Sequence, residues 1–97
     1  MAATTMLWRL DVAKGREAEF EALVSGLVRD VHANEPGQIF EYRKTRGERP
    51  QYILFLSFFD EEAFARYSAA PYHTGVSPAI MACLAGAPQG EPLDVFR

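Results

Sequence analysis

The stretch at residues 52–59 reads Tyr-Ile-Leu-Phe-Leu-Ser-Phe-Phe, which is apolar on both faces of a strand apart from Ser57. A strand of this kind is typical of the middle of a sheet whose two sides are both covered. We therefore expect a central strand at Gln51–Phe59. The preceding residues predict a partner strand at Ile39–Arg46, which is more exposed because charged residues interrupt its apolar positions.

The residues before this pair predict a strand and a long helix. Alternation of apolar and polar residues indicates the strand at Met6–Val12, and the segment Lys14–Glu17 opens the helix. Glu35–Gln38 reads Glu-Pro-Gly-Gln, which is typical of a type II turn with glycine at its third position. The apolar stripe of the helix has the 3.6-residue period and consists of Phe20, Leu23, Val24, Leu27 and Val31.

The residues after the central strand predict two helical pieces and a last strand. Asp60 is a typical N-cap, and its helix should end before Pro71. A second piece begins at Ser77 as N-cap, with Pro78 at the first helical position. We expect a short final strand at Leu93–Phe96.

This order of elements predicts an α+β fold of the ferredoxin-like β-α-β-β-α-β type, formed by residues 1–97 as a single domain. The four-stranded antiparallel sheet would hold the first and third strands at its centre and both helices on one face. The other face would then expose a large apolar patch that includes either Ile53, Phe55 and Phe59 or the opposite set. We therefore expect a homodimer that packs sheet against sheet.

Composition excludes several classes of function. The 97 residues carry 10 Lys and Arg against 13 Asp and Glu, so the net charge of −3 disfavours a nucleic-acid-binding protein. No apolar run reaches the roughly 18 residues of a membrane span, and no secretory signal is evident, so we expect a cytoplasmic protein. The single cysteine, Cys83, and the widely separated His32 and His73 predict no metal site.

Several short motifs, taken in order, give the chain a family resemblance. They are the Lys14-Gly15 pair before an acid-rich helix, the Glu35–Gly37 turn before a strand with Tyr42, the aromatic strand running into Asp60–Phe64, and the Ala-Pro-Tyr-His segment at residues 70–73. Together they cover nearly the whole chain, which resembles the antibiotic biosynthesis monooxygenase family, a family of dimeric α/β barrels.

The resemblance implies a chemistry and also marks departures from the family pattern. The family includes oxygenases that need neither metal nor flavin, so no cofactor is implied. Its members often carry a glutamate and then an aromatic residue on the third strand, where this chain has Leu56 and Phe58. They often carry histidine at the position of Tyr67 and again near the proline motif, where Tyr72 stands here with His73 beside it.

Five residues are candidates for a site, and each also has a structural interpretation. His73 can exchange protons near neutral pH, or it is a loop histidine bonded to backbone. Tyr67 and Tyr72 can donate hydrogen bonds to a substrate oxygen, or they fill the core. Trp8 and Phe58 can form an aromatic wall against a substrate, or they pack the core.

The first hypothesis is a cofactor-independent monooxygenase for a small electron-rich aromatic molecule, such as a quinol, phenol or anthrone. His73 would shuttle protons, Tyr67 and Tyr72 would stabilise the developing oxyanion, and Trp8 and Phe58 would hold the ring. The alternative is a non-catalytic dimeric module that binds a small molecule or a partner. A third hypothesis is an isomerase that turns substrate over without oxygen.

Overall fold

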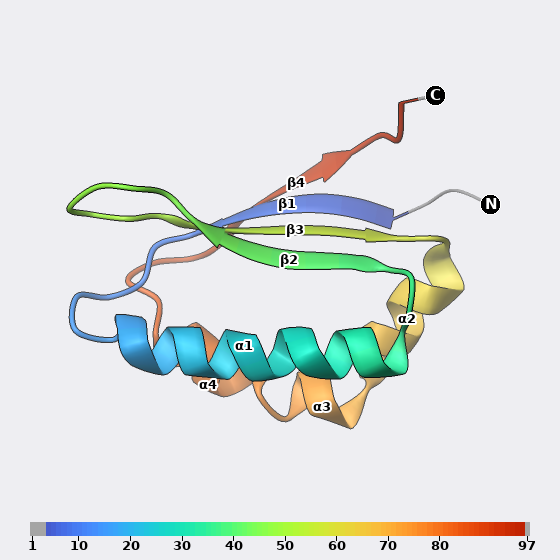
Figure 1. The fold of residues 1–97 in the computed structure, drawn as a ribbon, viewed down its shortest axis with the longest axis horizontal. Helices are drawn as coiled ribbons and strands as arrows, with labels where there is room; N and C mark the ends of the chain where they lie inside the picture. The colour runs from blue at the N-terminus through green and yellow to red at the C-terminus, as the bar shows by residue number, and fades with distance from the viewer. Residues whose placement is uncertain (1–3, 97) are drawn as a thin grey trace.

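The computed structural model describes residues 4–96, which form one four-stranded sheet with helices on one side (Figure 1). The three short helices α2, α3 and α4 together fill the second helical position, so the order is that of the predicted β-α-β-β-α-β fold. The elements in chain order are β1 (Thr4–Leu10), α1 (Glu17–Asn34), β2 (Ile39–Lys44), β3 (Tyr52–Phe58), α2 (Glu61–Ala69), α3 (Pro71–Thr74), α4 (Ser77–Ala82) and β4 (Gln89–Leu93).

The strands lie in the order β2-β3-β1-β4, and every neighbouring pair is antiparallel. The predicted central position of β1 and β3 is therefore confirmed, as is the ferredoxin-like fold. All four helices lie against the same face of the sheet (Figure 1). No element of residues 4–96 covers the other face, which we call the open face.

The core lies between the sheet and the helices. Alternation along β3 directs four buried side chains toward the helices, namely Tyr52, Leu54, Leu56 and Phe58. From the helical side, the predicted stripe of α1 supplies its buried side chains to the same layer, with Leu23 half-buried at its edge. The rings of Phe20 and Tyr52 lie 4.8 Å apart between their centroids.

Two of the predicted turn and cap signals are confirmed. Gly37 has a φ of +88°, which a type II turn requires at its third position. Asp60 caps α2, because its Oδ1 accepts a hydrogen bond of 2.9 Å from the backbone N–H of Ala63. The predicted cap at Ser77 is wrong: Val76 occupies the cap position of α4, and no side chain caps that helix. The chain between α3 and α4 is so short that Val76 already has helical backbone angles.

The predicted last strand is displaced toward the N-terminus. β4 occupies Gln89–Leu93 rather than Leu93–Phe96, and it pairs with β1 so that Gly90 lies opposite Trp8. A Cβ atom at Gly90 would stand 2.6 Å from the indole ring, so the tryptophan occupies the space of the missing side chain. Because this strand contains glycine and proline, it lacks the hydrophobic pattern that would predict a strand. Proline is nevertheless tolerated at a sheet edge.

The other boundaries differ from the predictions by a few residues, as strand and helix ends commonly do. β1 begins at Thr4 and ends at Leu10, and Val12 instead forms an isolated bridge with Leu84. Within residues 4–96, no helix is both long enough and apolar enough to cross a lipid bilayer.

Candidate active site

A cavity of about 240 Å³ lies between the helix-covered face of the sheet and the helices. Nine of its lining residues are apolar, which include Trp8 from β1 and Leu54 and Leu56 from β3. A mostly apolar cavity with a few polar groups is the usual composition of a small-molecule site. The polar groups that line it are Tyr42, Tyr67, Ser68, His73 and Ser77.

The structure brings three of the five predicted site residues together in this cavity. Trp8 reaches it from β1, Tyr67 from α2 and His73 from α3. Phe58 does not line the cavity, because its wholly buried ring lies behind Tyr67 with the two ring centroids 5.2 Å apart. Tyr72 does not line it either.

The side chains of Tyr72 and His73 point in different directions because the two residues are neighbours on a helix. Successive residues of a helix are rotated by about 100° around its axis. His73 contributes to the cavity, whereas Tyr72 lies closer to the end of α1, where the carboxylates of Glu35 and Asp30 add to the effect of burial in raising its pKa. Its hydroxyl is buried and has no hydrogen-bond partner within residues 4–96.

His73 is held in a defined orientation by two contacts. Its ring stacks on the ring of Tyr67, with 4.4 Å between the centroids and 38° between the planes. Its Nδ1 lies 3.1 Å from the backbone oxygen of Ser68. A carbonyl oxygen only accepts hydrogen bonds, so Nδ1 carries the proton in this contact. The neutral imidazole then keeps the lone pair of Nε2 for accepting a proton.

Tyr67 is the most enclosed polar group of the cavity. The side chain is buried, and its ring is surrounded by those of Phe40, Phe58 and Phe64 at centroid distances of 5.2 to 5.9 Å. Burial raises the pKa of its hydroxyl well above the usual value, and the neighbouring Tyr42 raises it further. The hydroxyl therefore stays protonated around neutral pH and is available as a hydrogen-bond donor.

Sequence reasoning missed Tyr42, Ser68 and Ser77 as cavity residues. A signal for Tyr42 was present, because alternation along β2 places it on the same face as the buried Phe40. Burial also raises the pKa of the Tyr42 hydroxyl, so it too stays protonated. The two serines carried no such signal, because they come from the ends of short helices.

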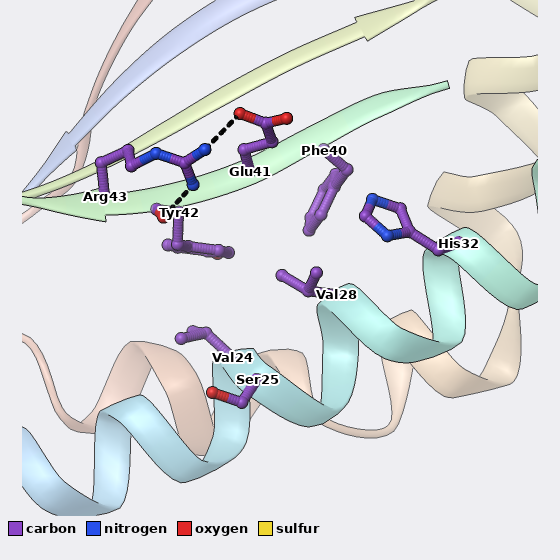
Figure 2. A pocket seen from close by; sticks show the side chains of 8 residues that line it. All are labelled: Val24, Ser25, Val28, His32, Phe40, Glu41, Tyr42 and Arg43. Atoms are coloured by element: carbon purple, nitrogen blue, oxygen red, sulfur yellow. Dashed lines mark hydrogen bonds and ion pairs between the residues drawn. The ribbon is translucent and has the colours of Figure 1, made fainter. Parts of the chain in front are cut away.

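A second hollow lies on the surface between α1 and β2 and is shown in Figure 2. This α1–β2 groove has a volume of about 420 Å³, and the exposed His32 lies on its rim. The guanidinium of Arg43 is already occupied there: it donates to the Glu41 carboxylate at 2.7 Å and to the backbone oxygen of Tyr42 at 2.8 Å. The other residues that line the groove are Val24, Ser25, Val28 and Phe40.

No group of three metal-ligating side chains gathers anywhere in residues 4–96. Cys83 ends α4 as a fully buried thiol. Its Sγ lies 3.9 Å from the guanidinium of Arg16, which also pairs with Glu19. These contacts lie outside the cavity lining.

Solved structures share this fold over nearly its whole length. A protein of Caulobacter crescentus, described as a candidate antibiotic biosynthesis monooxygenase, is 26% identical, with a TM-score of 0.90 over 99% of this chain and 92% of its own. SnoaB, a cofactor-independent oxygenase of Streptomyces nogalater, is 21% identical, with a TM-score of 0.78 over 100% and 96%. Rv0793 of Mycobacterium tuberculosis is 13% identical, with a TM-score of 0.82 over 99% and 97%. At their lower identities, the last two show the fold alone.

Comparison by sequence identifies a family. No curated protein sequence matches the chain. The profile of the antibiotic biosynthesis monooxygenase family matches residues 4–77, which include β1, α1, β2, β3, α2 and α3. This match contains every predicted site residue and agrees with the fold. The chain therefore belongs to the antibiotic biosynthesis monooxygenase family.

Proposed function

We propose that this protein is a monooxygenase that needs no metal or flavin and that oxidises a small electron-rich aromatic molecule, such as a quinol, phenol or anthrone. The observation that carries the proposal is the stacked pair of His73 and Tyr67 in a mostly apolar cavity. Such a substrate, once deprotonated, can itself pass an electron to dioxygen. The protein then has to exclude water, accept a proton and stabilise an oxyanion.

The reaction balances without an external reductant. For an anthrone, dioxygen places one oxygen atom on the ring carbon that carried two hydrogens, and this carbon becomes a carbonyl. The other oxygen atom leaves as water with both of those hydrogens, so the substrate supplies all the electrons. The protein's part is to move the first proton and to steady the negative charge that this removal creates on the substrate oxygen.

Each of the five predicted site residues is assigned only what its position and contacts allow. Nε2 of His73 accepts the substrate proton, because Nδ1 is engaged by the backbone oxygen of Ser68. The hydroxyl of Tyr67 donates to the substrate oxygen, and the indole of Trp8 forms part of the wall. Phe58 supports the ring of Tyr67 from behind and is a positioning residue. Tyr72 lies outside the cavity, so we assign it no contact with the substrate.

The second candidate is a non-catalytic module that binds a small aromatic molecule. What favours it is the identity of Leu56, which lines the cavity at the position where the family often carries glutamate. None of the described residues lining this cavity is an Asp or Glu, so any proton transfer depends on His73. A pocket that lacked this chemistry would still bind an aromatic ring.

We further propose that the open face pairs with a second copy of the chain. At its centre, Leu7 of β1 lies beside Phe55 of β3, and Ile53 follows along β3. Arg9 pairs with Glu91 at 3.2 Å on one flank of this apolar strip. Apolar strips with paired charges at the edge match the anatomy of subunit interfaces. Two sheets packed in this way would bury the side chains that the helices leave uncovered.

Oxygen uptake with a panel of quinols, phenols and anthrones tests the proposed function, with boiled protein as control. The monooxygenase consumes oxygen and substrate together, and uptake falls in His73→Ala. Product without oxygen uptake identifies an isomerase and overturns the proposal. Ligand that binds and stays unchanged under oxygen identifies the binding module instead.

A further inference from the structure

Tyr42 is the one residue that lines both the central cavity and the α1–β2 groove, among the described residues that form these two hollows. Figure 2 shows its ring extending from β2 toward α1, on the side of Val24. The groove continues past this ring, because a further hollow of about 200 Å³ shares Val24, Ser25, Tyr42 and Arg43 with it. Tyr42 therefore lies at the boundary between the cavity and the groove.

The two spaces differ in size. The central cavity has about 240 Å³, which is below the roughly 300–1,000 Å³ of sites for drug-sized ligands. The α1–β2 groove has about 420 Å³ and an apolar floor that includes Val24, Val28 and Phe40. A ligand with one or two rings suits the cavity alone. A longer ligand needs part of the groove as well.

Tyr42 is held as a wall rather than left as a mobile side chain. Its ring meets the ring of Phe20 edge-on at 6.0 Å and 81°, and that of Phe40 at 5.9 Å and 71°. Such edge-to-face pairs are a preferred arrangement of aromatic side chains. These two ring contacts hold the Tyr42 ring in place between the cavity and the groove.

We propose that Tyr42 is the specificity-determining residue of this site: its ring separates the cavity from the α1–β2 groove and favours ligands of one or two fused aromatic rings, such as a phenol or a quinol, over the three rings of an anthrone. The proposal rests on the proposed function only for the aromatic nature of the ligand. It predicts that removal of the ring joins the two spaces and improves the binding of a ligand with a third fused ring.

Trp8 provides a direct readout, because it is the only tryptophan of the chain and lines the cavity. Quenching of its fluorescence would be titrated with phenol, naphthol and hydroxyanthracene, under nitrogen so that no substrate turns over. The test variant is Tyr42→Val, since valine favours strands and lacks a ring. Tyr42→Phe removes only the hydroxyl, and Val28→Ala widens the groove without opening the wall.

We expect Tyr42→Val to raise the affinity for hydroxyanthracene relative to phenol by about tenfold or more, within the range that pocket shape confers. Tyr42→Phe and Val28→Ala should leave this ratio unchanged. Circular dichroism confirms folding, and Tyr42→Leu replaces the valine variant if that variant does not fold.

The inference is overturned if Tyr42→Val (or Tyr42→Leu in its place) leaves the affinity ratio unchanged, if Val28→Ala shifts the ratio equally, or if none of the three ligands quenches the fluorescence of Trp8. Because this assay measures binding without turnover, its result is separate from the proposed function. If no oxygen uptake is found, the proposed oxygenase function is overturned, but the role of Tyr42 is still tested by the affinity ratio.

Discussion

The imidazole of His73 lies on the ring of Tyr67, with 4.4 Å between the ring centroids, although the two residues belong to different helices. The bend that brings them together is encoded locally. Ala70 precedes Pro71 and takes an extended conformation, with φ −66° and ψ 137°, because the proline ring disfavours helical geometry there. α2 ends, α3 starts in a new direction, and His73 folds back onto Tyr67 and the backbone oxygen of Ser68.

Substitution of Tyr67 by phenylalanine should separate catalysis from packing. The variant keeps the ring contacts with Phe40 and Phe58 and loses only the donor hydroxyl. Loss of one donor to a developing oxyanion typically lowers kcat by about 10²–10³-fold, so we expect a loss of that size in oxygen uptake. Tyr72→Phe is the matched control and should retain activity, because Tyr72 lies outside the cavity. Equal activity losses in the two variants would contradict the assigned role.

Gly90 should tolerate no side chain, because a Cβ atom there would lie 2.6 Å from the Trp8 ring. We expect Gly90→Ala to lower the free energy of unfolding by about 1–3 kcal/mol, as overpacking does. The displaced indole should also change its fluorescence spectrum. Gly86→Ala is the control, since a Cβ atom at Gly86 would meet nothing within 4 Å. Chemical denaturation of both variants checks this, and equal stabilities would disprove the packing argument.

Alkaline pH should destabilise the fold through its buried tyrosines. Burial, together with the hydrogen bond to Glu21, raises the pKa of Tyr52 to about 12, whereas an unfolded tyrosine titrates near about 10. The folded state thus favours the neutral phenol. This stabilisation is complete below pH 10 or so and is lost as pH rises through about 12. The free energy of unfolding, measured by denaturation across this pH interval, should depend less on pH in Tyr52→Phe than in the parent protein. Equal pH dependence in the two proteins would show that Tyr52 does not cause the alkaline destabilisation.

The open face should direct self-association. Phe55→Asp places a charge beside Leu7 in the centre of that face, so we expect this variant to be monomeric where the parent chain is dimeric. Light scattering with size-exclusion chromatography measures the mass. Ala22→Asp, on an exposed site of α1, is the control and should remain a dimer. A parent chain that runs as a monomer would refute the proposed pairing.

The sequence was sufficient for most of the fold because periodicity reports burial directly. The stripe on α1 and the apolar run of β3 each matched one buried face in the structure. The last strand was misplaced because its packing depends on Gly90, whose contribution is the absence of a side chain opposite Trp8. No hydrophobic pattern records such an absence.

The candidate site was harder to predict because proximity in sequence does not fix the direction in which each side chain points. Tyr72 and His73 were grouped as neighbours, yet the short helix α3 places only His73 in the cavity lining. Phe58 shares a strand face with Leu56 but is separated from the cavity by Tyr67. Tyr42 was named only as part of a family motif, and its position between cavity and groove depends on how α1 packs on β2.

Isotopically labelled dioxygen tests the central claim most directly. The protein and its His73→Ala variant would each be incubated with labelled dioxygen and a quinol or phenol that supports oxygen uptake, and the masses of the products would be measured by mass spectrometry. We predict one labelled oxygen atom per product molecule, formed about 10²–10⁴-fold more slowly by the variant, the range for general acid–base catalysis. Product without the label, or a loss of less than threefold on removal of His73, would contradict the account.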